Sequence, residues 1–184
     1  MNKKIAIICL IVLACCAIGT VGYLVLKKRG NSADGTNDEM QIFSNQDNSY
    51  VLKLDNYVKF RETTAISNVN NKDGLEVNYG DNYITIQRFE YTTYNDNFSE
   101  FIKFIESTNN LASFNLVKDS TKIDNPAVQQ YEISYLSVVS GGKEFVGYLI
   151  YLKTDNGMYK MLISGSDKKL IEHYKMFVND MEFK

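Results

Sequence analysis

The sequence predicts an α+β fold: an antiparallel β-sheet packed with two α-helices and preceded by a single transmembrane helix. Three observations lead to this prediction. A long uncharged run stands near the N-terminus, β-rich segments separated by glycine turns follow Pro126, and two segments repeat their apolar residues with helical period. We expect an N-terminal transmembrane anchor with basic flanks over residues 1–29, a flexible linker over 30–48 and a folded domain over 49–184.

The N-terminal run contains no charged residue from Ile5 to Leu26. A helix of 22 residues spans about 33 Å, enough for a hydrocarbon core of about 30 Å. A cleavable signal has a shorter apolar region and a polar mature start, so we expect an uncleaved signal anchor. We place the N-terminus inside and the domain on the extracytoplasmic side of the cell membrane. Basic residues form the topology flanks: Lys3, Lys4, Lys27, Lys28 and Arg29.

Lipidation at Cys15 is the alternative interpretation of this segment. Residues 12–15 pass a loose lipobox pattern, with basic residues upstream. The chain then stays uncharged up to Leu26, and a lipidated Cys15 would leave that apolar stretch unexplained on the mature protein. The apolar continuation therefore favours a spanning helix.

The charges are distributed unevenly along the chain. Residues 1–29 carry five of the 20 basic residues and none of the 22 acidic ones, so the remainder is acidic. An acidic domain has no electrostatic reason to bind nucleic acid. All three cysteines lie in the apolar run, and His173 is the single histidine, which excludes intramolecular disulfides and most zinc and triad chemistries from the domain.

The first part of the domain reads as short strands followed by a helix. Residues 50–54 and 56–61 favour two strands, and 75–91 a hairpin turning at Gly80. Asn97, with Glu100 three residues later, has the spacing of a helix cap. The apolar residues that follow at helical spacing are Phe98, Phe101, Ile102 and Ile105.

The second part reads as a strand over residues 114–120 and then a three-stranded meander over 128–140, 144–154 and 158–166. Its turns contain Gly141-Gly142 and Asp155-Asn156-Gly157. Both alternating sets of the middle strand are apolar, which predicts a strand covered on two faces. A closing helix capped by Ser166 or Asp167 carries one apolar stripe: Leu170, Ile171, Tyr174, Phe177, Val178 and Met181.

This order of elements resembles the PsbP-like sandwich, the fold of small exported bacterial proteins of the DcrB and LpqN type. The resemblance covers residues 48–184 and rests on "YVLKLDNYVKF", "NFSEFIKFIES", the meander and "LIEHYKMFVNDMEF". It implies an antiparallel sheet between helices. It also implies a non-catalytic accessory role, since the lumenal plant members dock onto a membrane complex. An α+β roll with other connectivity is the alternative fold.

Tyrosine is the residue type that most suggests a function. A rigid ring with a hydroxyl suits contact surfaces that are partly apolar and partly wet. We therefore predict an interaction surface on the meander strands, formed by Tyr131, Tyr135, Tyr148 and Tyr151. No motif indicates a catalytic residue, a cofactor or a metal site.

We accordingly expect a single-pass membrane protein of the bacterial cell envelope, whose non-catalytic domain binds a protein partner as an accessory or scaffold subunit. One alternative is a small-ligand module with a cavity lined by Phe101, Phe104, Tyr131 and Tyr151. Another is a hydrolase, which requires two carboxylates converging in one cleft.

Overall fold

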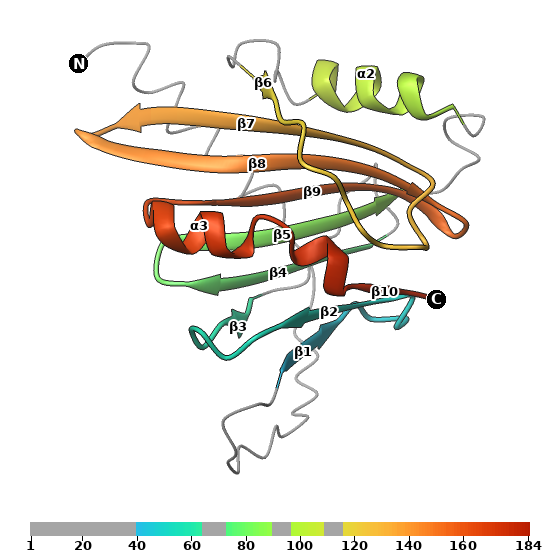
Figure 1. Cartoon of the computed structure of the whole chain (residues 1–184), viewed down its shortest axis with the longest axis horizontal. Helices are drawn as coiled ribbons and strands as arrows, with labels where there is room; N and C mark the ends of the chain where they lie inside the picture. The colour runs from blue at the N-terminus through green and yellow to red at the C-terminus, as the bar shows by residue number, and fades with distance from the viewer. Residues whose placement is uncertain (1–39, 64–72, 90–96, 109–115) are drawn as a thin grey trace, which may run out of the picture.

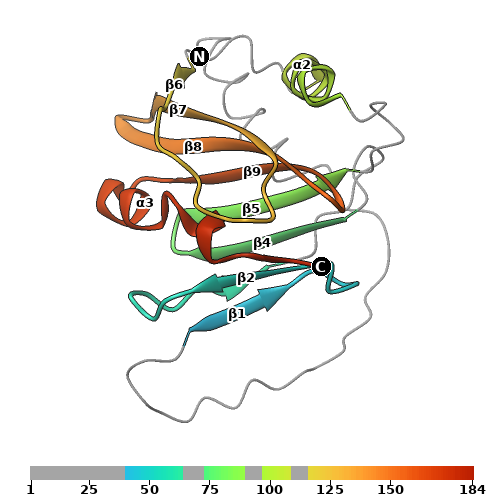
Figure 2. The same ribbon diagram turned by 45° about the vertical axis from the view of Figure 1, so that its right-hand side comes forward.

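The computed structural model describes residues 40–63, 73–89, 97–108 and 116–184. Most of these residues lie in antiparallel strands that form two sheets, and two α-helices and one 3-10 helix pack against them (Figures 1 and 2). The larger sheet is the scaffold on which everything else is placed.

The larger sheet contains the predicted hairpin and meander. In spatial order its strands are β3 (Arg61–Glu62), β4 (Asp73–Tyr79), β5 (Asn82–Phe89), β9 (Gly157–Gly165), β8 (Lys143–Thr154), β7 (Gln130–Ser140) and β6 (Val117–Lys118). Gly141 and Gly142 have φ of +61° and +79°, the left-handed region that a tight β7–β8 turn requires. The predicted meander is confirmed, and residues 90–91 of the predicted hairpin lie outside the described residues.

Strand β8 lies inside the sheet and is covered on both faces. Tyr148, Ile150 and Leu152 are buried on one face, and Leu149 and Tyr151 on the other. Each such side chain contributes about 1.5–3 kcal/mol when it leaves water. The predicted two-sided burial of this strand is confirmed.

One face of the large sheet carries the C-terminal elements and the small sheet. These are α3 (Lys168–Tyr174), η3 (Phe177–Asp180) and the strands β1 (Gln41–Ser44), β2 (Tyr50–Leu54) and β10 (Glu182–Phe183). The helix capped by Asp167 is shorter than predicted, because Met176 leaves the helical region with φ −109° and ψ 29°. That break lets the chain return as β10 beside β2, while the six residues of the predicted stripe stay buried.

The opposite face carries α2 (Phe98–Thr108) at the β7 end of the sheet (Figure 1). Phe101 and Ile105 are buried against Leu149 and Tyr151. The Glu100 N–H donates to Asn97 Oδ1 at 3.2 Å, so the predicted cap is confirmed. The two helices thus pack on opposite faces of one sheet.

The segment around residues 41–60 differs from the sequence prediction. Gln41–Ser44 forms strand β1, within the stretch for which a linker is predicted, and 56–60 forms a loop in place of a strand. The Gln41 side chain explains both. Its Nε2 donates to the carbonyls of Asp55 and Val58 (2.7 Å each), and its Oε1 accepts from the Phe60 N–H at 2.8 Å. One side chain therefore satisfies loop backbone groups that a strand would pair in a ladder.

The predicted transmembrane helix requires a correction. Among the described residues no helix is long and apolar enough to cross a membrane. The longest of them, α2, has 11 residues and spans about 17 Å, against a bilayer core of about 30 Å. The fold class is therefore mostly antiparallel sheet with two helices, and the predicted signal anchor, integral membrane partner and cell-membrane location are corrected on the same finding. The predicted span Ile5–Leu26 itself lies outside the described residues.

Among the described glycines, Gly165 has the least room for a side chain. We predict that Gly165→Ala lowers the free energy of unfolding by about 1–3 kcal/mol. A Cβ at this position would lie 2.1 Å from Asn82 Oδ1, which accepts the Asp167 N–H at 3.0 Å. Urea denaturation measures the loss. Gly141→Asn is the control, because no atom lies within 4 Å of its added Cβ and asparagine tolerates positive φ. Equal effects of the two substitutions would contradict the prediction.

Candidate functional site

The described surface is hollowed between the first turn of α2 and the start of β7. We call this open depression the α2–β7 groove. Polar side chains from both elements line the groove, and Phe98 and Ile102 contribute half-buried apolar area. The lining residues are Asn97, Phe98, Ser99, Ile102, Gln129, Gln130, Tyr131, Glu132 and Lys153.

Among the described strands, none pairs with the edge of β7 where it borders the groove. Strand β6 pairs with β7 only at Val117↔Tyr135 and Lys118↔Ser134. After β6, the Asp119 N–H donates to the Ile133 carbonyl at 2.9 Å. The Ile133 carbonyl therefore points away from β8. Because backbone groups in an antiparallel strand alternate in direction, the N–H and C=O of Tyr131 also point away from β8. This edge can accept hydrogen bonds from another extended chain.

The structure separates the four tyrosines of the predicted interaction surface. Tyr131 is 40% exposed and lines the groove, and Tyr135 is half-buried. Tyr148 and Tyr151 are 4% and 1% exposed, so they belong to the core. Tyr151 also lies on the opposite face of the sheet from the other three, as the register of β7 and β8 shows. The structure therefore leaves Tyr131 as the surface member of the set.

Tyr148 belongs to a polar cluster beneath α3. Its hydroxyl donates to the Glu172 carboxylate, and Lys175 Nζ lies 4.6 Å from the centre of its ring. Lys175 also pairs with Asp119 at 2.9 Å. Burial, and then the bond to Glu172, raise the pKa of Tyr148. These contacts hold α3 and the loop after β6 against the sheet, a structural role.

The predicted ligand cavity is filled in the structure. Phe101 and Tyr151 are buried and pack edge to face, with ring centroids 6.0 Å apart and an interplanar angle of 88°. Phe104 is half-buried beside them. Of the four residues predicted to line a cavity, only Tyr131 lines the α2–β7 groove.

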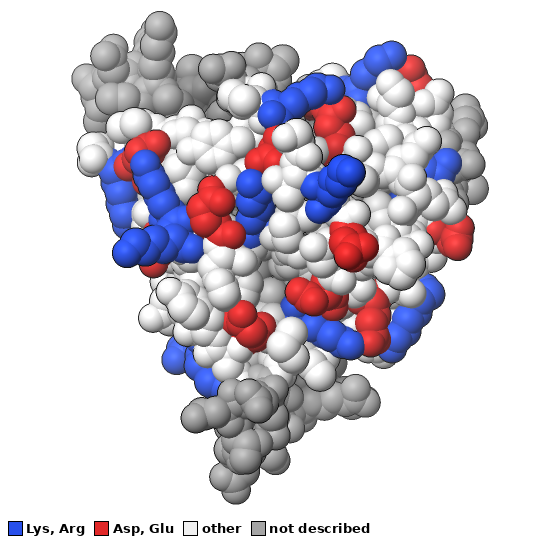
Figure 3. Space-filling view, viewed as in Figure 1, with Lys and Arg blue, Asp and Glu red and all other residues white. Residues whose placement is uncertain are grey.

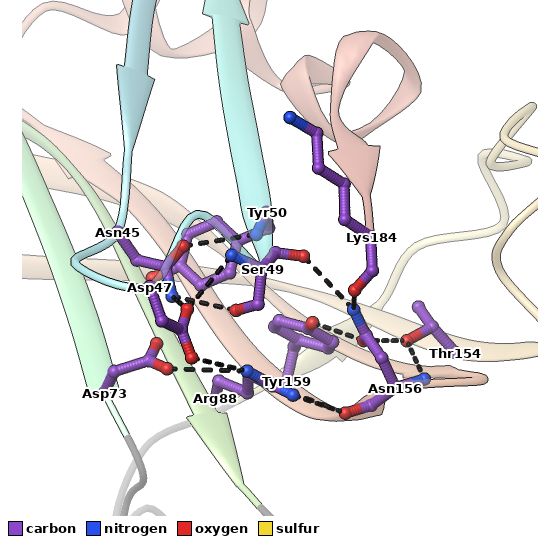
Figure 4. Close-up of polar contacts among 10 residues, drawn as sticks. All are labelled: Asn45, Asp47, Ser49, Tyr50, Asp73, Arg88, Thr154, Asn156, Tyr159 and Lys184. Carbon is purple, nitrogen blue, oxygen red and sulfur yellow. Dashed lines mark hydrogen bonds and ion pairs between the residues drawn. The ribbon is translucent and has the colours of Figure 1, made fainter.

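A second polar site, which the sequence does not predict, joins the two sheets (Figure 4). We call it the Arg88 junction. The Arg88 guanidinium lies 3.3 Å from Asp47 and 3.7 Å from Asp73, and it donates to the Asn156 carbonyl at 2.9 and 3.3 Å. Arg88 is only 9% exposed. A buried arginine requires such partners, because an uncompensated charge would cost several kcal/mol.

The two carboxylates of the Arg88 junction differ in protonation behaviour. Burial and the Asp47 charge raise the pKa of Asp73, with Arg88 opposing them. Burial acts to raise the pKa of Asp47 too, but hydrogen bonds from Ser49 and Asn45 and the Arg88 charge hold it below its ordinary value. The two carboxylates therefore converge, as the hydrolase alternative requires, but on a shared guanidinium. Since neither lines the α2–β7 groove, their arrangement supports a structural role.

His173 lies at the end of α3 and contacts the loop after β2. Its Nε2 is 2.8 Å from Asp55 Oδ2, and the Tyr174 hydroxyl donates to Asp55 Oδ1 at 2.7 Å. The exposed Tyr57 ring packs on the His173 imidazole, with the two ring centroids 4.3 Å apart. Burial acts to raise the pKa of Asp55, but the bonds from Tyr174, Tyr57 and His173 lower it overall. The single histidine thus fastens a loop to a helix.

The remaining sequence-predicted site residues are not placed. The candidate lipidation site Cys15, the topology flanks Lys3, Lys4, Lys27, Lys28 and Arg29, and the span ends Ile5 and Leu26 lie outside the described residues. Within the described part of the chain, no group of three or more His, Cys, Asp or Glu side chains could hold a metal ion.

On the face that carries α3, acidic and basic side chains are interspersed (Figure 3).

Comparison with known proteins identifies no family. No family model and no curated protein matches the chain. Among solved structures, a protein of unknown function from Pseudomonas aeruginosa matches with 9% identity and a TM-score of 0.35, covering 74% of this chain and 88% of its own. At this TM-score the match supports no conclusion about fold or function, and the PsbP-like resemblance stays a prediction.

We predict that Arg88→Met lowers the free energy of unfolding by about 3–5 kcal/mol, because it leaves the largely buried Asp73 carboxylate without its counter-ion. Chemical denaturation measures the change. Lys118→Met is the matched control: its pair with Glu132 is exposed, with 78% of the lysine side chain accessible, so it should cost about 0–1 kcal/mol. If Arg88→Met were as mild as its control, the junction would not be essential to the fold.

We also predict a pH-dependent contribution from Asp119. Burial acts to raise its pKa, but bonds from Lys175 and Thr121 outweigh this and lower it from 3.8 to about 2. A depressed carboxyl pKa stabilises the fold above the unfolded value, and this stabilisation is lost as the pH falls toward 2. Asp119→Asn should therefore destabilise the protein near neutral pH, and the difference from the unmodified chain should vanish in strong acid.

Urea midpoints across that pH range test this prediction. Asp124→Asn, an exposed carboxylate of the same loop, is the control and should change the midpoint little at any pH. A constant difference between Asp119→Asn and the unmodified chain at every pH would show that packing, and not charge, is responsible.

Proposed function

We propose that this chain is a non-catalytic protein-binding domain that holds an extended segment of a partner protein in the α2–β7 groove. The observation that carries the proposal is the open edge of β7 at Tyr131, directly beside a groove lined with polar side chains. An extended peptide gains affinity from main-chain hydrogen bonds to such an edge and specificity from neighbouring side-chain pockets.

The groove offers the groups that a polypeptide needs. Gln130 and Ser99 are amide and hydroxyl side chains that can donate to and accept from peptide groups. Phe98 and Ile102 provide half-buried apolar area for a partner side chain. Tyr131 contributes its edge backbone N–H and C=O, since its side chain shares the face of Leu152, opposite α2.

The sequence of β7 also fits a strand that receives a partner. An edge strand that must avoid pairing usually carries lysine, proline or a bulge. Between Gln130 and Ser140 the single charged residue is Glu132, and there is no proline. Glu132 pairs with Lys118 of β6 at 3.0 Å, so its charge is balanced locally. The sequence of β7 itself therefore carries little of the usual protection against an added strand.

Ionisable groups elsewhere support a role without catalysis. The carboxylates of the Arg88 junction and of the cluster beneath α3 are held in ion pairs or hydrogen bonds that join elements of the fold. Their burial and partners serve packing, whereas the groove presents mainly neutral side chains. The geometry thus favours binding over proton transfer.

Selection of peptides on the full-length chain from a displayed library of random extended peptides tests the proposal. We expect Phe98→Ala to weaken an enriched peptide at least about tenfold, since an aromatic anchor in the groove contributes about 1.4 kcal/mol or more. Fluorescence anisotropy with a labelled peptide measures the dissociation constant. A proline substituted into the bound peptide should also weaken it, because proline removes a ladder hydrogen bond.

Tyr79→Ala is the matched control. Tyr79 is 47% exposed on β4, which three strands separate from β7 in the larger sheet. The control should bind the peptide as the unmodified chain does. Equal binding by the Phe98→Ala variant, or equal loss in both variants, would reject the α2–β7 groove as the binding site.

A further inference from the structure

The β8–β9 turn contains the one Asn-Gly pair of the sequence, Asn156-Gly157. An asparagine followed by glycine is the residue most prone to lose its side-chain amide spontaneously, because glycine leaves the following backbone nitrogen unobstructed. This pair stands at the Arg88 junction, where Asn156 also offers its backbone carbonyl to Arg88. The most labile amide of the chain is therefore placed in the contacts that join the two sheets.

The Asn156 side chain connects segments that are far apart in the sequence (Figure 4). Its Nδ2 donates to the carbonyls of Ser49 at 3.1 Å and Lys184 at 2.6 Å. Its Oδ1 accepts from the Tyr159 hydroxyl at 2.6 Å and from Thr154 Oγ1 at 2.7 Å. Both functional atoms of the amide are thus engaged, each by two partners.

We propose that Asn156 is a site of spontaneous deamidation and that its contacts in the folded protein suppress the reaction. The product loses the hydrogen bonds from Nδ2 to the Ser49 and Lys184 carbonyls that hold the junction together. The reaction needs only water. The Gly157 backbone nitrogen attacks Cγ of Asn156, a C–N bond forms, and the bond from Cγ to Nδ2 breaks. Ammonia leaves with the former Gly157 amide proton, and a five-membered succinimide remains.

Water then opens the succinimide. Its oxygen adds to one of the two ring carbonyls, the bond from that carbonyl to the ring nitrogen breaks, and a water proton restores the backbone N–H. The product is aspartate or isoaspartate at position 156. Overall one water is consumed and one ammonia released, with no oxidation or reduction.

The folded structure opposes the first step. Loss of Nδ2 as ammonia breaks its bonds to the Ser49 and Lys184 carbonyls, and the two hydroxyl bonds to Oδ1 hold the side chain in place. The bonds from Arg88 to the Asn156 carbonyl further restrict the backbone of the turn. The reaction therefore requires local opening, whose free energy lowers the observed rate by the fraction of time the turn is open.

The product cannot restore the original contacts. A carboxylate has no N–H, so its oxygens would face the Ser49 and Lys184 carbonyls that the amide held. The charged carboxylate would repel these carbonyl oxygens, and both carbonyls would lose their Nδ2 donor. The nearby Arg88 would attract the new charge, but its guanidinium already serves Asp47 and Asp73. Deamidation thus releases β10 and the turn before β2 from the large sheet and makes a local opening permanent.

Peptide mapping by mass spectrometry on the full-length chain tests the first half of the proposal. The chain is incubated in mildly alkaline buffer, once folded and once in concentrated urea, and the mass increase at Asn156 is followed over time. We expect deamidation at least about tenfold slower in the folded chain, corresponding to an opening free energy above about 1.4 kcal/mol. Equal rates in the two conditions would overturn the proposal.

The variant Asn156→Asp tests the second half. We expect a lower Tm and faster hydrogen exchange of the Lys184 amide, whose N–H donates to the Ser49 carbonyl at 2.8 Å. Asn97→Asp is the matched control, because the cap at Asn97 uses only an acceptor oxygen that aspartate retains. An unchanged Tm and unchanged Lys184 exchange in Asn156→Asp would refute the unfastening. If this variant does not fold, the two incubation rates of the unmodified chain still decide the first half.

Discussion

The burial of the Arg88 guanidinium is the constraint on which the arrangement of the two sheets depends. An arginine that is 9% exposed is tolerated only when partners offset its lost hydration. Those partners come from separate places: Asp47 before β2, Asp73 on β4 and the Asn156 carbonyl in the β8–β9 turn. The small sheet must therefore sit against the end of the large sheet before the charge is compensated. The same geometry lets Asn156 reach the C-terminal strand, so one charge organises four segments.

Elements set by local periodicity could be predicted from the sequence, whereas those set by distant partners could not. The β4–β5 hairpin, the meander and α2 with its Asn97 cap depend on residues close to one another in the chain. Arg88 contacts Asp47 and Asn156, which are separated from it by 41 and by 68 positions in the sequence. Asn156 contacts Ser49, from which it is separated by 107 positions. Strand β10 is only two residues long and exists because Met176 ends the helical path in time for the chain to meet β2. Nothing in the local pattern of these residues indicates such partners.

The candidate binding surface shows the same division between residue type and position. Tyrosine chemistry suggested an interface, but strand position decides which tyrosines are exposed. The prediction that β8 is covered on both faces already implied that Tyr148 and Tyr151 are buried, since both lie on that strand. Combining the two arguments would have left Tyr131 and Tyr135 on β7. The α2–β7 groove itself could not be foreseen, because it depends on where the first turn of α2 lies relative to an edge strand.

The groove and the Arg88 junction are physically connected through the β8–β9 turn. Gln129, which lines the groove, donates its side-chain amide to Asp155, and its backbone N–H donates to the Lys153 carbonyl at 2.8 Å. Asn156 follows Asp155 in the turn, and its side chain forms the hydrogen bonds of the junction to Ser49 and Lys184. Under the proposed function, a segment in the groove contacts Gln129 and Lys153, which adjoin the turn that carries Asn156. If such binding stabilises the turn, linkage requires that an intact junction strengthens the binding by the same free energy. The candidate groove and the Arg88 junction therefore border the same short turn.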